Sequence, residues 1–106
     1  MTSAIVVMYD AEPELDAWMH GPHYDEVLAI PGVTGVRRLR VIDGPPDARK
    51  YLAIIETTDL AATQAWRNSP AGQRSQADAN DRGVSRRSGL TAEIIFDSTA
   101  QTIPSR

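Results

Sequence analysis

Residues 18–32, WMHGPHYDEVLAIPG, contain both histidines of the chain and one of its two tryptophans, and they end in a proline and a glycine. Apolar residues recur at helical spacing on both sides of the Gly-Pro pair inside this stretch, which predicts helical segments over 12–20 and 23–30. The Pro-Gly pair at the end is typical of a stop after a helix. We therefore expect two helical pieces in succession, followed by a strand.

Gly21 and Pro22 separate these two pieces. A proline inside a helix removes one hydrogen bond and clashes with the preceding turn, so we expect the helix to kink or break at this point. Side chains beside such a break can point into a cavity between the helix and the rest of the fold. The sequence therefore predicts that His20 and His23 lie near one cavity.

The rest of the chain predicts an α+β order around this stretch. Short apolar runs rich in β-branched residues and bounded by turn residues are typical of strands. These runs predict strands over 4–8, 33–42, 50–57 and 90–97. A second helix is expected over 60–68, with Thr58 or Asp59 as its N-cap, whereas 71–81 is expected to form only one or two turns and 83–89 a basic connection.

The order strand, helix, strand, strand, helix, strand is that of the ferredoxin-like βαββαβ fold, in which a four-stranded antiparallel sheet carries its helices on one face. With 106 residues the chain is near the commonest size of one domain, so we expect a single domain over 1–97 and a C-terminal tail over 98–106. Predicted strands are apolar at successive positions, as at Ile54 and Ile55, which indicates a sheet buried on both faces. We therefore expect a homodimer whose sheets pack face to face and form an α/β barrel.

Composition excludes several classes of function. The absence of cysteine excludes disulfides, thiolate metal sites and cysteine nucleophiles. A net charge of −3 at pH 7 provides no basic field for nucleic acid. No apolar run is long enough for a membrane span or a signal segment, so we expect no membrane partner and a cytoplasmic location.

His23 is the leading candidate for catalysis, because histidine titrates near neutral pH and is the commonest general acid or base. The alternative is a structural histidine that bonds a backbone carbonyl at the helix break. His20 is the second candidate, and it is equally consistent with a surface histidine paired with Asp16 one turn earlier. A metal site would need a third ligand that no tight spacing supplies, so no metal and no cofactor are predicted.

The aromatic residues supply further candidates. Tyr51 and Tyr9 are placed on strands from which a phenolic hydroxyl can donate to a carbonyl oxygen. Tyr24 follows the leading histidine and is a candidate pocket wall. Trp18 and Trp66 lie on the apolar faces of two helices, where core packing is the default; if either lines a cavity, the ligand is expected to be flat or apolar.

Arg38 and Arg40 belong to an arginine-rich strand, so at least one guanidinium in this strand faces inward or lies at an edge of the sheet. An inward arginine can hold a carboxylate or an enolate oxygen in bidentate fashion. An ion pair between subunits, with Glu56 or Glu93 on neighbouring strands, is the alternative.

The order of Trp18, His23, Pro-Gly at 31–32 and Arg-Arg at 37–38 resembles the EthD-like members of the dimeric α/β-barrel superfamily. The resemblance extends more loosely through the predicted hairpin and the helix that follows it. It implies a ferredoxin-like homodimer with the histidine beside a cavity between helix and sheet. The chain departs from the family at 19–22, where an aromatic residue, an acid or amide and more helical residues are usual.

The resemblance also implies a class of reaction. Lyase, cyclase, isomerase and monooxygenase chemistries occur among similar proteins, and most of them share a deprotonation next to a carbonyl. We therefore predict a cofactor-independent enzyme whose histidine acts as acid–base on a small, apolar, oxygenated molecule. Two alternatives remain: a small-ligand-binding or stress-response module without catalysis, and a cofactor-independent or heme-type monooxygenase.

Overall fold

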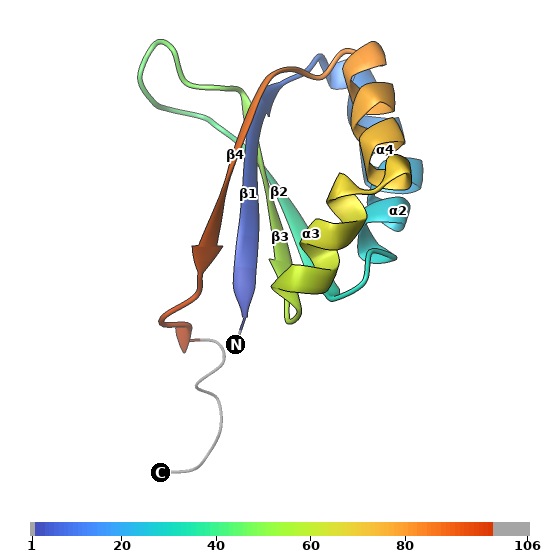
Figure 1. The fold of residues 1–106 in the computed structure, drawn as a ribbon. Coiled ribbons are helices and arrows are strands. Elements are labelled where there is room, and N and C mark those ends of the chain that lie inside the picture. The colour runs from blue at the N-terminus through green and yellow to red at the C-terminus, as the bar shows by residue number, and fades with distance from the viewer. Residues whose placement is uncertain (1, 99–106) are drawn as a thin grey trace.

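Four antiparallel strands form one sheet in the computed structural model, which describes residues 2–98 (Figure 1). Their order across the sheet is β2-β3-β1-β4, as the ferredoxin-like topology requires. The strands are β1 (Ser3–Asp10), β2 (Val33–Arg40), β3 (Tyr51–Thr57) and β4 (Ser85–Glu93). Apart from Ser98, the predicted tail over 98–106 lies outside the described residues.

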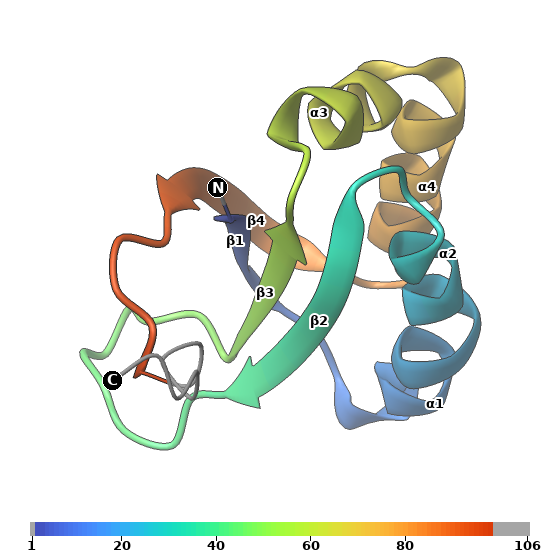
Figure 2. The same cartoon turned by 90° about the horizontal axis from the view of Figure 1, so that it is seen from below.

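All the helices lie on one face of the sheet, which Figures 1 and 2 show from two directions. The N-terminal helical stretch consists of a 3-10 turn (Pro13–Leu15), α1 (Asp16–Trp18), a π-helical turn (Met19–His23) and α2 (Tyr24–Leu28). After the hairpin of β2 and β3 come α3 (Leu60–Asn68) and α4 (Pro70–Asp81). The predicted ferredoxin-like α+β fold is confirmed.

At Gly21 and Pro22, where a kink or a break was expected, the regular α-helix is interrupted but the chain remains helical. These two residues lie inside the π-helical turn, and the backbone N–H of Tyr24 reaches back to the carbonyl oxygen of Met19. This longer hydrogen bond bypasses Pro22, which has no N–H to donate, and the wider turn accommodates its ring. The chain thus keeps its helical path but changes the direction in which the following side chains point.

Two predictions about the second half of the chain were wrong. Residues 71–81, expected to form one or two turns, belong to the full helix α4; the hydroxyl of Ser69 accepts a hydrogen bond from the N–H of Gly72, and Pro70 occupies the first helical turn. The last strand starts at Ser85, five positions before the expected strand over 90–97. Strand β4 is an edge strand, so its pairing with β1 does not require an apolar sequence.

The core lies between the helices and one face of the sheet. Alternate residues of β1 and β3 face the helices and are buried in opposed pairs, such as Ile5 with Ile55 and Tyr9 with Tyr51. Apolar side chains also occupy the other face of the sheet, which carries no helix. The apolar residues of this open face are Val6, Met8, Leu39, Leu52, Ile54 and Leu90, and the ion pair of Arg37 and Glu56 lies on the same face.

Pro31 and Gly32, predicted to end the N-terminal helical stretch, contact the start of α3. Gly32 has φ +89°, and a Cβ there would lie 2.8 Å from Thr57 Oγ1. Thr63 Oγ1 donates to the carbonyl of Pro31 at 2.7 Å. Within the part of the chain that the structure describes, no helix is long and apolar enough to cross a membrane.

Candidate functional site

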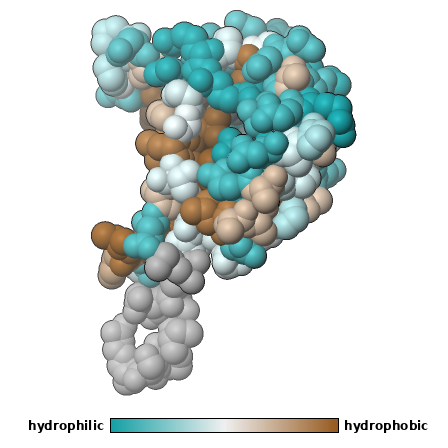
Figure 3. Space-filling view, in the orientation of Figure 1, coloured by the Kyte–Doolittle hydropathy of each residue, from teal (hydrophilic) through white to brown (hydrophobic). Residues whose placement is uncertain are grey.

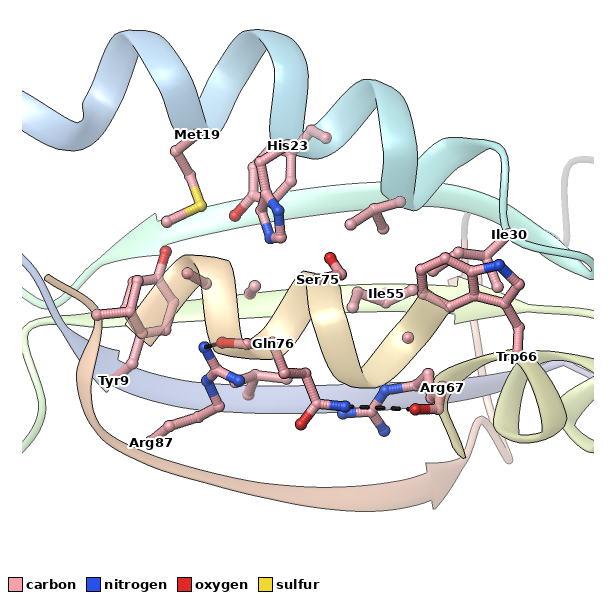
Figure 4. A pocket seen from close by; sticks show the side chains of 17 residues that line it. Tyr9, Met19, His23, Ile30, Ile55, Trp66, Arg67, Ser75, Gln76 and Arg87 are labelled. Atoms are coloured by element: carbon pink, nitrogen blue, oxygen red, sulfur yellow. Dashed lines mark hydrogen bonds between the residues drawn. The ribbon is translucent and has the colours of Figure 1, made fainter. Parts of the chain in front are cut away.

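A cavity of about 90 Å³ lies between the helices and the sheet. Figure 4 shows it from close by, and Figure 3 shows hydrophobic side chains in the gap between the sheet and the hydrophilic outer surface of the helices. Its apolar wall is formed by Val7, Met19, Val27, Ile30, Ala53, Ile55, Ala79 and Val84. Its polar and aromatic side chains are Tyr9, His23, Tyr24, Trp66, Arg67, Ser75, Gln76 and Arg87. A largely apolar cavity with a few convergent polar groups is the usual form of a small-molecule site.

His23 enters the cavity from the end of the π-helical turn (Figure 4). Its ring is half-buried and stacks on Trp18, with ring centroids 4.7 Å apart. Burial lowers the pKa of His23 below its ordinary value of 6.5. No hydrogen bond holds the imidazole among residues 2–98, so the alternative of a structural histidine bonded to a backbone carbonyl is not observed. The ring is therefore neutral near pH 7 and has a free nitrogen that can accept a proton.

Two tyrosine side chains line the same cavity as this imidazole. Tyr24 is 8% exposed, and its hydroxyl has no hydrogen-bond partner in the described structure. Burial, with a further contribution from the nearby Tyr9, raises the pKa of Tyr24 well above its ordinary value. Its phenol therefore stays protonated and keeps an O–H that can donate to a ligand.

Tyr9 differs from Tyr24 because its oxygen is already bonded. Arg38 Nε donates to the Tyr9 hydroxyl oxygen at 2.7 Å, which leaves the O–H proton of Tyr9 free to donate elsewhere. The same arginine bonds Asp16 Oδ1 at 2.7 Å and lies 3.1 Å from His20 Nε2. Its guanidinium also covers the ring of Tyr51, 4.0 Å from the centroid. Arg38 thus fixes the Tyr9 hydroxyl from behind the cavity.

The structure brings four of the nine predicted site residues, Tyr9, His23, Tyr24 and Trp66, to the wall of the cavity. The other predicted residues do not line it: Trp18, His20, Arg38, Arg40 and Tyr51. The expectation that both histidines share one cavity is therefore not met, because the π-helical turn rotates them apart and His20 is exposed beside Arg38. Trp18 and Tyr51 support the site indirectly, through their stacking on His23 and Tyr9. Arg40 is exposed at the end of β2.

The alternative interpretation of the arginine strand was an ion pair between subunits. In the structure Arg37 pairs with Glu56 of the same chain at 3.0 Å, on the neighbouring strand. Asp16, considered as a partner of His20, is paired with Arg38, which lowers the pKa of Asp16.

Four polar residues of the cavity were missed from the sequence: Arg67, Ser75, Gln76 and Arg87. Arg87 had been placed in a basic connection, because the last strand was predicted to begin later. Gln76 was missed because the segment over 71–81, which contains it, was expected to form only one or two turns. Among residues 2–98 there is no group of three or more histidine, cysteine or acidic side chains that could hold a metal ion.

The sheet order and the helices on one face define a ferredoxin-like α+β protein. No protein-family model matches the chain, and no curated protein matches its sequence. Solved structures do match it. A DABB family protein with a ferredoxin-like fold from Mesorhizobium loti MAFF303099 has a TM-score of 0.70 at 17% identity, covering 90% of this chain and 98% of that one.

Two further structures connect the fold to named families and activities. An EthD family protein from Bacillus halodurans C-125 has a TM-score of 0.60 at 16% identity, covering 90% of this chain and 100% of that one. SnoaB, a cofactor-independent oxygenase from Streptomyces nogalater, has a TM-score of 0.68 at 15% identity, covering 91% and 95%. Proteins from Jannaschia sp. CCS1 and Thermobifida fusca YX with this fold are described as dimeric. At these identities the likeness establishes the fold, and the predicted EthD-like resemblance is confirmed at that level.

Proposed function

We propose that this protein is a small enzyme that removes a proton next to a carbonyl group of an apolar, oxygenated molecule without a cofactor. The observation that carries the proposal is the neutral, unbonded imidazole of His23 in an apolar cavity, beside the unpartnered hydroxyl of Tyr24. A histidine fully hydrogen-bonded within the protein would favour a binding module, because its ring nitrogens could not take up a proton from a ligand. The free imidazole therefore favours catalysis over simple sequestration.

In this mechanism the free nitrogen of His23 accepts the proton from the substrate carbon. The electron pair of the broken C–H bond moves toward the carbonyl, so negative charge develops on its oxygen. The hydroxyls of Tyr24 and Tyr9 donate hydrogen bonds to that oxygen, and the surrounding apolar side chains strengthen both bonds by excluding water. His23 then returns the proton to a different atom of the intermediate, which completes an isomerisation.

The comparisons support this proposal at the level of the fold. SnoaB is a cofactor-independent oxygenase with the same architecture, and it is an example of small-molecule chemistry performed on such a scaffold. A shared fold does not fix a reaction, so the residues of this chain carry the specific proposal. The lowered pKa of His23 suits the role of a base rather than of an acid at neutral pH.

A reaction with a probe molecule tests the proposal without knowledge of the natural substrate. A base that removes the ring C–H proton of nitrobenzisoxazole causes its N–O bond to break and releases a coloured cyanonitrophenolate. We expect the wild-type chain to accelerate this reaction by about a hundredfold or more over the His23→Gln variant, the usual contribution of a positioned base. The rate should fall on the acid side with a midpoint below pH 6.5, the ordinary value for histidine.

His20→Gln is the matched control, because this exposed histidine lies outside the cavity. The control should react as fast as the wild type. Equal rates for wild type and His23→Gln would contradict the proposal. Circular dichroism should show the same helix content in all three proteins, so that a lost fold is not mistaken for a lost base.

We also propose that the protein is a homodimer formed through the open face of the sheet. Leu39 lies opposite Leu52, and Leu52 lies opposite Met8, so apolar side chains run across three strands. Val6, on the same face, is opposite both Ile54 and Leu90. Such a contiguous apolar face is typical of an interaction surface, and the dimeric proteins of this fold make a second copy the natural occupant.

A further inference from the structure

Arg67, Gln76 and Arg87 form a polar group at one side of the cavity, contributed by α3, α4 and β4 (Figure 4). They also line a second hollow of about 300 Å³, which extends along β4 toward Leu90 and Thr91. The two spaces share these three side chains, so the guanidinium groups stand where the apolar cavity opens into the second hollow. A ligand that fills the cavity from this side must pass or contact them.

Among residues 2–98, neither Arg67 nor Arg87 has an acidic partner. Their hydrogen bonds go to neutral oxygens: Arg67 Nη1 to Gln64 Oε1 at 3.4 Å, and Arg87 Nη2 to the carbonyl of Gln76 at 3.4 Å. Four other arginines of the described chain are paired with carboxylates, namely Arg37, Arg38, Arg82 and Arg86.

The absence of a carboxylate is costly for these two side chains, because both are half-buried. Burial lowers the pKa of Arg67, and burial together with the charge of Arg67 lowers the pKa of Arg87. Two positive charges thus face the same space and repel one another. An anion placed between them would relieve the repulsion and accept charge-assisted hydrogen bonds from both.

Arg87 lies on the side of the sheet opposite to the proposed dimer interface. Arg87 and Thr91 are on the helix-facing side of β4, whereas Leu90 points to the open face. The proposed dimer interface lies on that open face. The two guanidinium groups therefore remain available to a ligand inside the same subunit.

We propose that Arg67 and Arg87 bind a carboxylate group of the substrate, whose apolar part lies in the cavity against His23. This inference rests on the proposed function, because it names the substrate class of the same site. The carboxylate fixes one end of the ligand at the opening, and the apolar wall holds the remainder. The substrate class is then an apolar carboxylic acid that carries a carbonyl group.

The test compares two probes that share an apolar chain and differ in charge, octanoate and octanol. Isothermal titration calorimetry on the full chain should show that octanoate binds about tenfold or more tightly than octanol, as expected for charge-assisted hydrogen bonds. Arg67→Gln and Arg87→Gln should each remove most of this preference and leave octanol binding unchanged. Arg87→Lys keeps the charge but not the planar fork, so it should retain an intermediate preference.

Arg74→Gln is the matched control, because this exposed arginine of α4 lines neither space. It should bind both probes as the wild type does. Equal affinities of octanoate and octanol for the wild type, undetectable binding of both, or an unchanged preference in the Arg67 and Arg87 variants would each overturn the inference. Thermal unfolding of every variant checks that it is folded.

His23→Gln separates this inference from the proposed function. The variant should keep the preference for octanoate, because its arginines are intact, while it loses the reaction with nitrobenzisoxazole. If His23→Gln loses the reaction but the wild type shows no preference for octanoate, His23 is the base and the anion site is rejected. If the wild type prefers octanoate but His23→Gln reacts as fast as the wild type, the anion site is retained and the catalytic role of His23 is rejected.

Discussion

The hydroxyl of Tyr24 is buried beside the cavity and makes no hydrogen bond within residues 2–98. A buried polar group without a partner lowers stability, since its hydrogen bonds to water are lost and not replaced. Such a group is retained where a ligand supplies the partner. At the scale of single residues, stability and the proposed function therefore make opposite demands on this side chain.

We predict that Tyr24→Phe raises the free energy of unfolding by about 1 kcal/mol and slows the nitrobenzisoxazole reaction. Tyr9→Phe is the matched comparison. It removes the acceptor of Arg38 Nε and should lower the free energy of unfolding by about 1–3 kcal/mol. Urea titrations of the three proteins measure both changes. A Tyr24→Phe variant less stable than the wild type would show that the hydroxyl has a partner after all.

His23 makes stability depend on pH. In the folded state burial holds the pKa of His23 below 6.5, whereas the unfolded chain titrates near that ordinary value. As pH falls through 6.5 the unfolded state therefore takes up a proton before the folded state does. This contribution to stability is fully present above that pH and is lost progressively below it.

We predict that the free energy of unfolding of the wild type falls more steeply between about pH 7.5 and pH 5.5 than that of His23→Gln. Every other titratable group, His20 included, is common to the two proteins and cancels in the comparison. Urea unfolding at several pH values in this window measures the two slopes. Identical slopes would mean that the imidazole is not desolvated.

At the scale of elements, two glycines in helical segments contrast sharply. A Cβ added at Gly21, in the π-helical turn, would have no atom within 4 Å. A Cβ at Gly72, in α4, would overlap the backbone carbonyl oxygens of Trp66 and Arg67. The first glycine only loses entropy on folding, whereas the second permits α4 to pack against the end of α3.

We predict that Gly21→Ala raises the free energy of unfolding by about 0.5–1 kcal/mol, because alanine restricts the unfolded chain and favours helical backbone. Gly72→Ala should lower it by about 1–3 kcal/mol through the forced overlap. Thermal or urea unfolding of both variants gives the two signs. If Gly21→Ala also lowered the free energy of unfolding, the prediction would be contradicted, and the π-helical turn would require a backbone conformation at Gly21 that alanine disfavours.

The elements also show what sequence patterns can and cannot predict. The ends of β1, β3 and the capped helix α3 were predicted to within two residues, because the periodicity of apolar residues reports burial along one element. Helix α4 and strand β4 were misplaced because both are polar. A polar edge strand is held by backbone pairing with β1, and a polar helix is held by its cap and by small buried residues such as Gly72 and Ala79.

At the scale of the whole molecule, the open face of the sheet should determine the oligomeric state. Leu39 is 43% exposed in the single chain, so a charged residue there is compatible with the fold of one subunit. We predict that the wild type is a dimer and that Leu39→Glu is largely monomeric, because a carboxylate on this face would be buried without a partner in the dimer. Size-exclusion chromatography with light scattering measures both masses.

Ile42→Glu is the control for this experiment. Ile42 is 93% exposed between β2 and β3, outside the open face, so the variant should remain dimeric. A monomeric wild type would contradict the proposed interface. Circular dichroism should show that both variants keep the fold.

The sequence by itself determined the order of the four strands, the helical segments before β2 and after β3, the ferredoxin-like fold and the position of His23 in the N-terminal helical stretch. These follow from local patterns, namely apolar spacing, caps and turn residues, which act over a few positions of the chain. The role of each arginine was decided only by the tertiary structure. Strand pairing brings Arg38 from β2 against Tyr9 of β1, and the packing of α3 and α4 on the sheet brings Arg67 toward Arg87. These contacts depend on the register of the strands and on the rotation of each helix about its axis. A shift of one residue in the register or in the helix would turn the same side chain toward a different neighbour.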